Sequence, residues 1–123
     1  MNTKRQSIEK KILNYSELKG FDMLVLLTEY IRCVDLNKDI LYLAISEVEN
    51  FLEYSADKSL TPIQQAEHLI KLNIKSNKEY SKQVIFVIFG PDEHTVDKES
   101  VIREYIKTEP MGYYRNLALE HIQ

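Results

Sequence analysis

Hydrophobic residues recur at intervals of three and four along most of this chain, and polar residues fill the positions between them. This spacing predicts amphipathic helices at about residues 4–18, 21–34, 38–56, from 62 onward, 98–108 and 111–122. Glycine and proline number only three each, so long stretches lack the residues that interrupt helices. The pattern predicts an all-α fold, a compact bundle of five or six helices in a single domain covering residues 1–123.

Several polar residues mark where these helices begin and end. Thr61, Pro62 and Gln64 combine an N-cap, a proline at the first helical position and a capping-box glutamine. Asp97 is placed to cap helix 98–108, and either Asp35 or Asn37 to cap helix 38–56. Gly20 is predicted to end the first helix in a left-handed conformation, and Ser76 with Glu79 offers a further capping box. These capping residues therefore specify where the helices begin and end more closely than the hydrophobic spacing alone.

The segment 83–89 is ambiguous, because Val84–Phe89 is an unbroken run of β-branched and aromatic residues that ends at Gly90 and Pro91. Such a run suits a buried strand or a buried helix. A helix is favoured, since no second strand is available to pair with it. The alternative is an α+β fold with one strand at 83–89.

The helical wheel predicts which side chains form the core. Leu27 and Tyr30 lie on the apolar arc of helix 21–34, and Val48 and Leu52 on that of helix 38–56. The remaining inward positions are Ile8, Ile12, Tyr15, Met23, Leu24, Leu26, Ile31, Cys33, Val34, Ile40, Leu41, Ala44, Ile45, Phe51, Ser55, Ile63, Ala66, Ile70, Ile74, Val101, Ile102, Tyr105, Ile106, Met111, Tyr114, Ala118 and Ile122.

Composition narrows the class of protein. A chain that is 44% hydrophobic and 28% charged is typical of a soluble globular protein. No apolar run is long enough to span a membrane and the N-terminus lacks the apolar core of a signal peptide, so we expect a cytoplasmic protein without a membrane partner. Cys33 is the only cysteine, which rules out a multi-cysteine zinc site, and no metal or cofactor is predicted. Abundant Lys, Asn, Ile and Tyr are typical of AT-rich bacterial or phage genomes.

Acidic residues form the first candidate site. Glu49, Glu53 and Asp57 fall at i, i+4 and i+8 of the predicted helix 38–56 and just beyond it, with Asp39 on the same side. Like charges at this spacing slightly destabilise a helix, which suggests that they serve a partner with a basic surface. A solvated face that maintains solubility is the alternative interpretation. The net charge of −3, without a basic stripe, makes nucleic acid an unlikely partner.

An aromatic residue forms the second candidate site. Tyr113 and Tyr114 point to nearly opposite sides of the last predicted helix, so at least one is expected to be exposed. Tyrosine is a good interface anchor, because it offers a large contact area and a hydroxyl at a low entropic cost. Tyr113 is therefore a candidate contact for a partner, unless both rings simply lie at the core boundary.

The C-terminal segment carries the one hint of catalysis. Arg115 is followed directly by Asn116, and His121 comes five residues later. This arrangement resembles the Arg-Asn…His motif of the HEPN ribonucleases, which are also small and all-helical. The resemblance implies that Arg115 binds the scissile phosphate and His121 exchanges protons with the reacting oxygens, with two motifs combined in a dimer.

These observations favour a binding protein over an enzyme. We expect a small cytosolic protein-binding factor, such as an inhibitor, immunity protein, antitoxin-like factor or regulator, that acts through protein–protein contacts, with a homodimer as one option. The HEPN-like ribonuclease is the alternative function.

Overall fold

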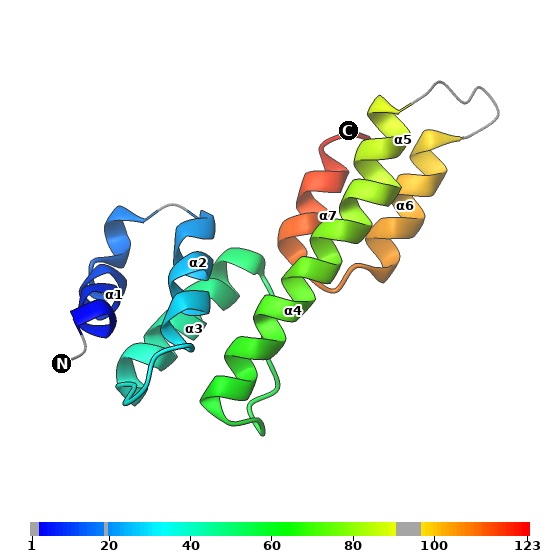
Figure 1. The fold of residues 1–123 in the computed structure, drawn as a ribbon. Coiled ribbons are helices and arrows are strands. Elements are labelled where there is room, and N and C mark those ends of the chain that lie inside the picture. Colours follow the sequence, from blue (N-terminus) through cyan, green and yellow to red (C-terminus); the bar gives the residue numbers. More distant parts are fainter. Residues whose placement is uncertain (1–2, 19, 91–96) are drawn as a thin grey trace. The chain divides into compact units, whose positions relative to one another are not determined.

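The computed structural model describes residues 3–18, 20–90 and 97–123, and every regular element in these residues is helical (Figure 1). The elements in chain order are α1 (Thr3–Leu13), η1 (Tyr15–Glu17), α2 (Gly20–Tyr30), α3 (Lys38–Leu52), α4 (Pro62–Tyr80), η2 (Ser81–Ile85), α5 (Phe86–Phe89), α6 (Lys98–Thr108) and α7 (Gly112–Leu119). The short element η1 is a 3₁₀-helix, and η2 is a π-helix. The all-α prediction is confirmed for the described residues.

Contacts along the chain divide it into two compact units, and each is described by itself. The first unit comprises Met1–Phe51 and Ser55–Lys71, and the second comprises Leu52–Tyr54 and Leu72–Gln123. The chain passes from the first unit to the second within helix α4.

In the first unit, helix α1 packs against α2, and the apolar faces of α2 and α3 supply most of the core. Leu27 is fully buried, and the Tyr30 ring is enclosed with it. The Tyr30 hydroxyl donates a 2.5 Å hydrogen bond to the Glu9 carboxylate. Burial, and then this hydrogen bond, raise the pKa of Tyr30 to about 12. The phenol therefore stays protonated in the folded protein well above its ordinary range.

This raised pKa predicts a loss of stability at high pH. The pKa of the Tyr30 phenol is near 10 in the unfolded chain but about 12 in the folded one, so raising the pH through this window favours unfolding by up to about 3 kcal/mol. Urea unfolding below and above pH 10 should show that Tyr30→Phe flattens the decline. Tyr42→Phe, which alters an exposed ring, should leave it unchanged. Equal declines in Tyr30→Phe and the parent protein would contradict the assignment.

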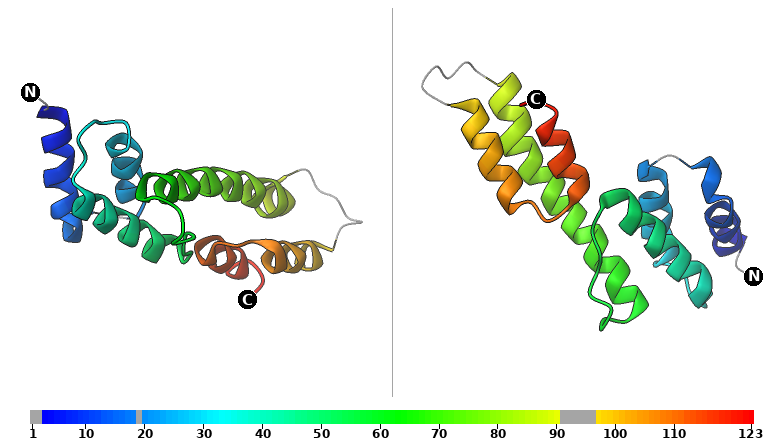
Figure 2. Two further views of the ribbon diagram at one scale, coloured as in Figure 1. Left: turned by 90° about the horizontal axis from the view of Figure 1, so that it is seen from below. Right: turned by 180° about the vertical axis from the view of Figure 1, so that it is seen from behind.

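In the second unit, α6 and α7 lie side by side against one side of the continuous helix formed by α4, η2 and α5 (Figure 2). The core between them contains Val84 from η2, Ile102 and Tyr105 from α6, and Tyr114 from α7. The segment 52–54 joins this unit through a 3.1 Å hydrogen bond from the Gly112 amide to the Glu53 carbonyl.

Most predicted helix starts are confirmed. Thr61 and Gln64 form a reciprocal capping box, with hydrogen bonds of 3.0 Å from the Thr61 amide and 3.2 Å from the Gln64 amide. The Asp97 carboxylate accepts a 3.2 Å hydrogen bond from the Ser100 amide, and α6 begins and ends where predicted. Of the two candidate caps for α3, the Asn37 side chain makes the contacts, accepting from the Asp39 and Ile40 amides.

Several boundary predictions are wrong. Helix α3 ends at Leu52 instead of residue 56, because Glu53 adopts a left-handed backbone with a φ of 53°. Gly20 begins α2 without a positive φ, and an added Cβ there would strike the Phe51 ring. Its role is close packing and not a left-handed helix end. The Ser76 capping box does not form, because α4 continues through it.

The strand alternative at 83–89 is also wrong, since these residues complete η2 and form α5. Two core assignments on α4 fail as well: Ile63 is 43% exposed and Ile74 is 62% exposed, whereas Ala66 is buried as predicted and Leu69 is buried too. Tyr15, also predicted to face inward, is 43% exposed. Val34 is exposed because α2 ends at Tyr30, before the predicted residue 34.

Candidate interaction surface

α6 and α7 lie along one side of the α4–η2–α5 helix (Figure 2), and several of the other residues of this helix are exposed. Ile74 is 62% exposed, Phe86 61% and Phe89 71%. We call this set the lysine–phenylalanine face; its members are Ile74, Lys78, Lys82, Phe86 and Phe89. Large apolar side chains grouped on an otherwise charged face are typical of a binding surface.

The π-helix η2 aligns this face. Phe86 follows Ile74 by twelve residues, which in an uninterrupted α-helix would rotate it by about 120° around the axis. The i→i+5 hydrogen bonding of η2 takes up one extra residue, which brings Phe86 back to within about 20° of Ile74. As a result, Ile74, Lys78, Lys82 and Phe86 form one row along the helix.

The same insertion aligns the buried side of the helix. Ser76, Tyr80, Val84 and Ile88 are also spaced four residues apart, and they include the side chains that are most deeply buried in this stretch. Ser76 is 2% exposed and Val84 is fully buried. The packing of one side against α6 and α7 therefore fixes the direction in which the phenylalanines point. Short π-helical insertions such as η2 are frequent at functional sites.

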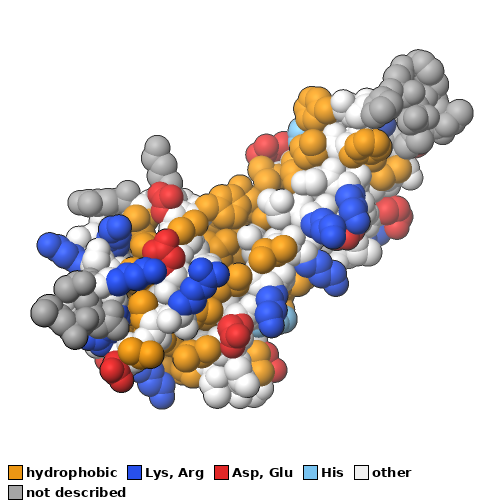
Figure 3. Space-filling model, viewed as in Figure 1, with side chains coloured by type: hydrophobic (Ala, Val, Ile, Leu, Met, Phe, Trp, Pro, Cys, Tyr) orange, Lys and Arg blue, Asp and Glu red, His pale blue; other side chains and the backbone are white. Residues whose placement is uncertain are grey.

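The face is basic as well as apolar. Within the described part of the chain, neither Lys78 nor Lys82 forms an ion pair. The nearest carboxylate along the helix, that of Glu79, accepts a 2.7 Å hydrogen bond from the side-chain amide of Gln83. Figure 3 shows basic and hydrophobic side chains interspersed over the region of α4 and α5. The aliphatic stems of lysine extend such an apolar surface and leave the ammonium groups available.

The phenylalanine end of the face has additional contacts. An open hollow of about 380 Å³ lies against Ser81, Lys82 and Phe86. The Phe89 ring meets the His121 ring edge to face, with ring centres 6.3 Å apart. The His121 Nε2 atom lies 3.2 Å from the Tyr80 hydroxyl. The C-terminal segment thus supports one edge of the face.

A buried carboxylate organises the opposite side of the same helix. Glu109 is 6% exposed, and its oxygens accept hydrogen bonds of 2.7 Å from the Ser76 hydroxyl, 2.9 Å from Tyr105 and 2.8 Å from the Met111 amide. These contacts tie α4, α6 and the start of α7 together. Burial, and then the bond to Glu109, raise the pKa of Tyr105.

A pocket of about 250 Å³ lies beside this carboxylate, between α4 and α6. Lys75, Glu79 and Gln83 lie on its α4 side, and Thr108 and Pro110 on the other. Because three donors satisfy the Glu109 carboxylate and one of them is the N-cap amide of α7, its evident role is structural.

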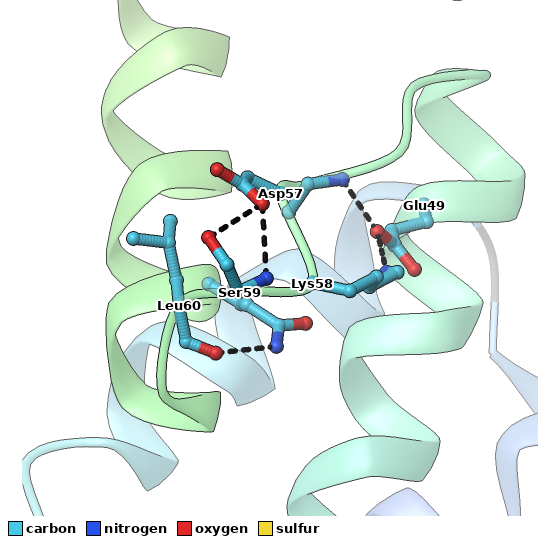
Figure 4. Close-up of polar contacts among 7 residues, drawn as sticks. Glu49, Asp57, Lys58, Ser59 and Leu60 are labelled. Atoms are coloured by element: carbon cyan, nitrogen blue, oxygen red, sulfur yellow. Dashed lines mark hydrogen bonds and ion pairs between the residues drawn. The ribbon is translucent and has the colours of Figure 1, made fainter.

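The predicted acidic face does not exist as a helical row, because α3 ends at Leu52. Glu49 is held inside the first unit, where its carboxylate accepts hydrogen bonds of 2.6 Å from the Ala56 amide and 2.5 Å from Lys58 (Figure 4). Asp57 is exposed and accepts from the Ser59 amide and hydroxyl, which lower the pKa of its carboxyl group. Asp39 is exposed at the start of α3.

Glu53 belongs to the second unit, where its exposed carboxylate accepts a 2.8 Å hydrogen bond from the side-chain amide of Asn116. Tyr113, the predicted aromatic anchor, is half-buried, with its ring 5.0 Å from the buried Tyr114 ring. These two predicted contacts therefore lie in the unit that carries the lysine–phenylalanine face.

The residues of the ribonuclease-like motif have structural partners. The Arg115 guanidinium donates to the Glu109 and Pro110 carbonyls at 2.8 and 2.9 Å, which secures the turn before α7. The side-chain amide of Asn116 donates its hydrogen bond to the Glu53 carboxylate. His121 is exposed and follows the end of α7 at Leu119, whereas the sequence had predicted it on the apolar arc of a helix running to residue 122.

Sequence reasoning missed the lysine–phenylalanine face for an identifiable reason. The sequence predicts Val84–Phe89 as a buried segment and Ile74 as an inward position, so neither indicates an exposed surface. The available signal was the repeated four-residue spacing of Ile74, Lys78, Lys82 and Phe86, which drifts by about 40° per step around a regular α-helix and stays aligned only where the helix takes up an extra residue.

No protein-family model matches this chain, and no curated protein or solved structure matches it significantly. Among the described residues, no group of three or more His, Cys, Asp or Glu side chains is arranged to hold a metal ion. Nor does any helix in the described ranges combine the length and the hydropathy that crossing a membrane requires.

Proposed function

We propose that this protein acts by protein–protein contact and that the lysine–phenylalanine face is the contact surface. The observation that carries the proposal is the exposure of Phe86 and Phe89, 61% and 71%, beside the exposed Lys78 and Lys82 of the same helix. Burying a phenylalanine side chain gains about 2 kcal/mol, so covering both would supply a substantial part of a binding free energy.

The rigidity of the surface also supports binding. The face lies on a continuous helix that is packed along its other side, and Glu109 fixes that packing through three elements. A surface that is already ordered loses little conformational entropy when a partner covers it. The proposal extends to the roles of inhibitor, immunity protein, antitoxin-like factor and regulator.

Two earlier hypotheses receive less support. A basic partner was inferred from a helical acidic row, and that row is broken after Leu52, with Glu49 already paired to Lys58. The ribonuclease alternative assigns phosphate binding to Arg115, whose guanidinium is engaged by two carbonyls. The positions of the acidic residues and of Arg115 therefore support these two hypotheses less than they support contact through the lysine–phenylalanine face.

Photo-crosslinking in the producing cells tests the proposal. A photoreactive phenylalanine analogue at position 86 should form protein adducts, because that ring would lie inside the interface. The same analogue at Tyr42, an exposed ring on α3, is the matched control and should form few. Adducts that are equally abundant at both positions, or absent at 86, would refute the proposal.

A further inference from the structure

We infer that the partner presents an acidic amphipathic helix to the lysine–phenylalanine face, an inference that rests on the proposed function. The central row of the face reads apolar, basic, basic, apolar: Ile74, Lys78, Lys82 and Phe86. Each of these four residues is exposed. A complementary helix would present carboxylates toward the two lysines and apolar side chains toward Ile74 and Phe86.

The dimensions of the row suit a helix. Twelve residues separate its ends, a length of about 18 Å, or somewhat more than three helical turns. Lys78 and Lys82 are one turn apart, so two carboxylates at i and i+4 on a partner helix have the matching separation. The open hollow beside Phe86 provides space for one apolar side chain of that helix.

The positive charge of the lysine–phenylalanine face indicates that the partner is acidic. Lys78 and Lys82 are exposed on this face, and the one carboxylate between them in sequence, that of Glu79, is only half-exposed and is hydrogen-bonded to the Gln83 side chain. An apolar partner without carboxylates would leave the ammonium groups partly desolvated without compensation. An acidic helix supplies the counter-charges and covers the phenylalanines at the same time.

The charge of the whole chain favours a short acidic segment over an extended polyanion. The net charge is −3, so a nucleic acid or an anionic membrane, whose charge continues beyond the face, would repel the rest of the protein. The aromatic rings also project from a helix surface, whereas single-stranded nucleic acids typically bind in basic grooves. A single helix interacts with the lysines alone.

The test uses the full-length protein and a synthetic helical peptide with glutamates at i and i+4 and leucines one turn before and after them. We expect this peptide to bind, and its affinity to fall as the salt concentration rises. A peptide of identical design with lysines in place of the glutamates should not bind. Fluorescence anisotropy of labelled peptides measures both.

Charge-reversal variants test whether the glutamate peptide binds at the lysine–phenylalanine face. Lys78→Glu with Lys82→Glu should weaken binding of the glutamate peptide by at least about tenfold and create binding of the lysine peptide. Lys10→Glu with Lys11→Glu makes the same change in net charge on exposed residues of α1 and should alter neither. Circular dichroism of each variant verifies that the helices are retained.

The outcomes separate this inference from the proposed function. Crosslinking at Phe86 without binding of the glutamate peptide would overturn the acidic-helix inference and leave the protein-binding function standing. Binding of oligothymidylate or of phosphatidylserine vesicles in place of the peptide, lost in the Lys78/Lys82 variant, would also overturn it. Self-association of the purified protein that the same variant abolishes would assign the face to a second copy, with the same consequence.

Discussion

Leu27→Ala should lower the free energy of unfolding by about 2–5 kcal/mol, because the side chain is fully buried in the first unit and its removal leaves a cavity. Leu52→Ala tests the second unit in the same way, since Leu52 is also fully buried. Urea unfolding followed by circular dichroism gives both values. Val25→Ala, at a position that is 54% exposed on the same helix as Leu27, should cost less than about 1 kcal/mol.

The two leucine substitutions also report on cooperativity. If the two units unfold together, each variant should shift a single transition. If they unfold separately, Leu27→Ala should shift one transition and Leu52→Ala the other. Losses below about 1 kcal/mol at both sites would contradict the packing described for both cores.

Glu109→Ala should lower the free energy of unfolding by about 3 kcal/mol. The substitution leaves the Ser76 hydroxyl, the Tyr105 hydroxyl and the Met111 amide without their common acceptor, and unsatisfied buried donors cost about 1–3 kcal/mol each before relaxation. Thermal and urea unfolding measure the loss.

The control for this substitution lies on α6. Glu104 is exposed and pairs only at the surface with Lys107, at 3.0 Å, so Glu104→Ala should change stability by less than about 0.5 kcal/mol. Similar effects of Glu104→Ala and Glu109→Ala would show that the buried carboxylate does not hold α4, α6 and α7 together.

Local signals in the sequence were sufficient for the fold class and for several boundaries. The capping box of Thr61 and Gln64 and the N-cap of Asp97 involve residues three apart, so the chemistry that starts these helices is complete within one turn. The burial of Leu27, Val48, Leu52 and Tyr114 was likewise predicted from the helical wheel, because each lies at the centre of an apolar arc.

The end of α3 could not be predicted this way. Nothing in the residue type of Glu53 requires a left-handed backbone; there the Glu53 carbonyl accepts a hydrogen bond from Gly112 and its carboxylate one from Asn116. Those partners are about sixty residues away in the sequence. The candidate acidic row failed for the same reason, since its spacing assumed a helix that tertiary contacts interrupt.

The sequence by itself determined that this chain is helical, where two of its helices start, and which side chains form the centre of its core, because helix propensity, capping and amphipathic spacing act within a few residues. Only the tertiary structure decided which side of the apolar segment 84–89 would be exposed. Packing of Val84 against the other helices of its unit, together with the extra residue taken up by η2, sets the rotation of the helix, and that rotation places Phe86 in line with Lys78 and Lys82. A segment that is apolar on every side carries no internal preference for a direction, so its orientation depends on what it packs against.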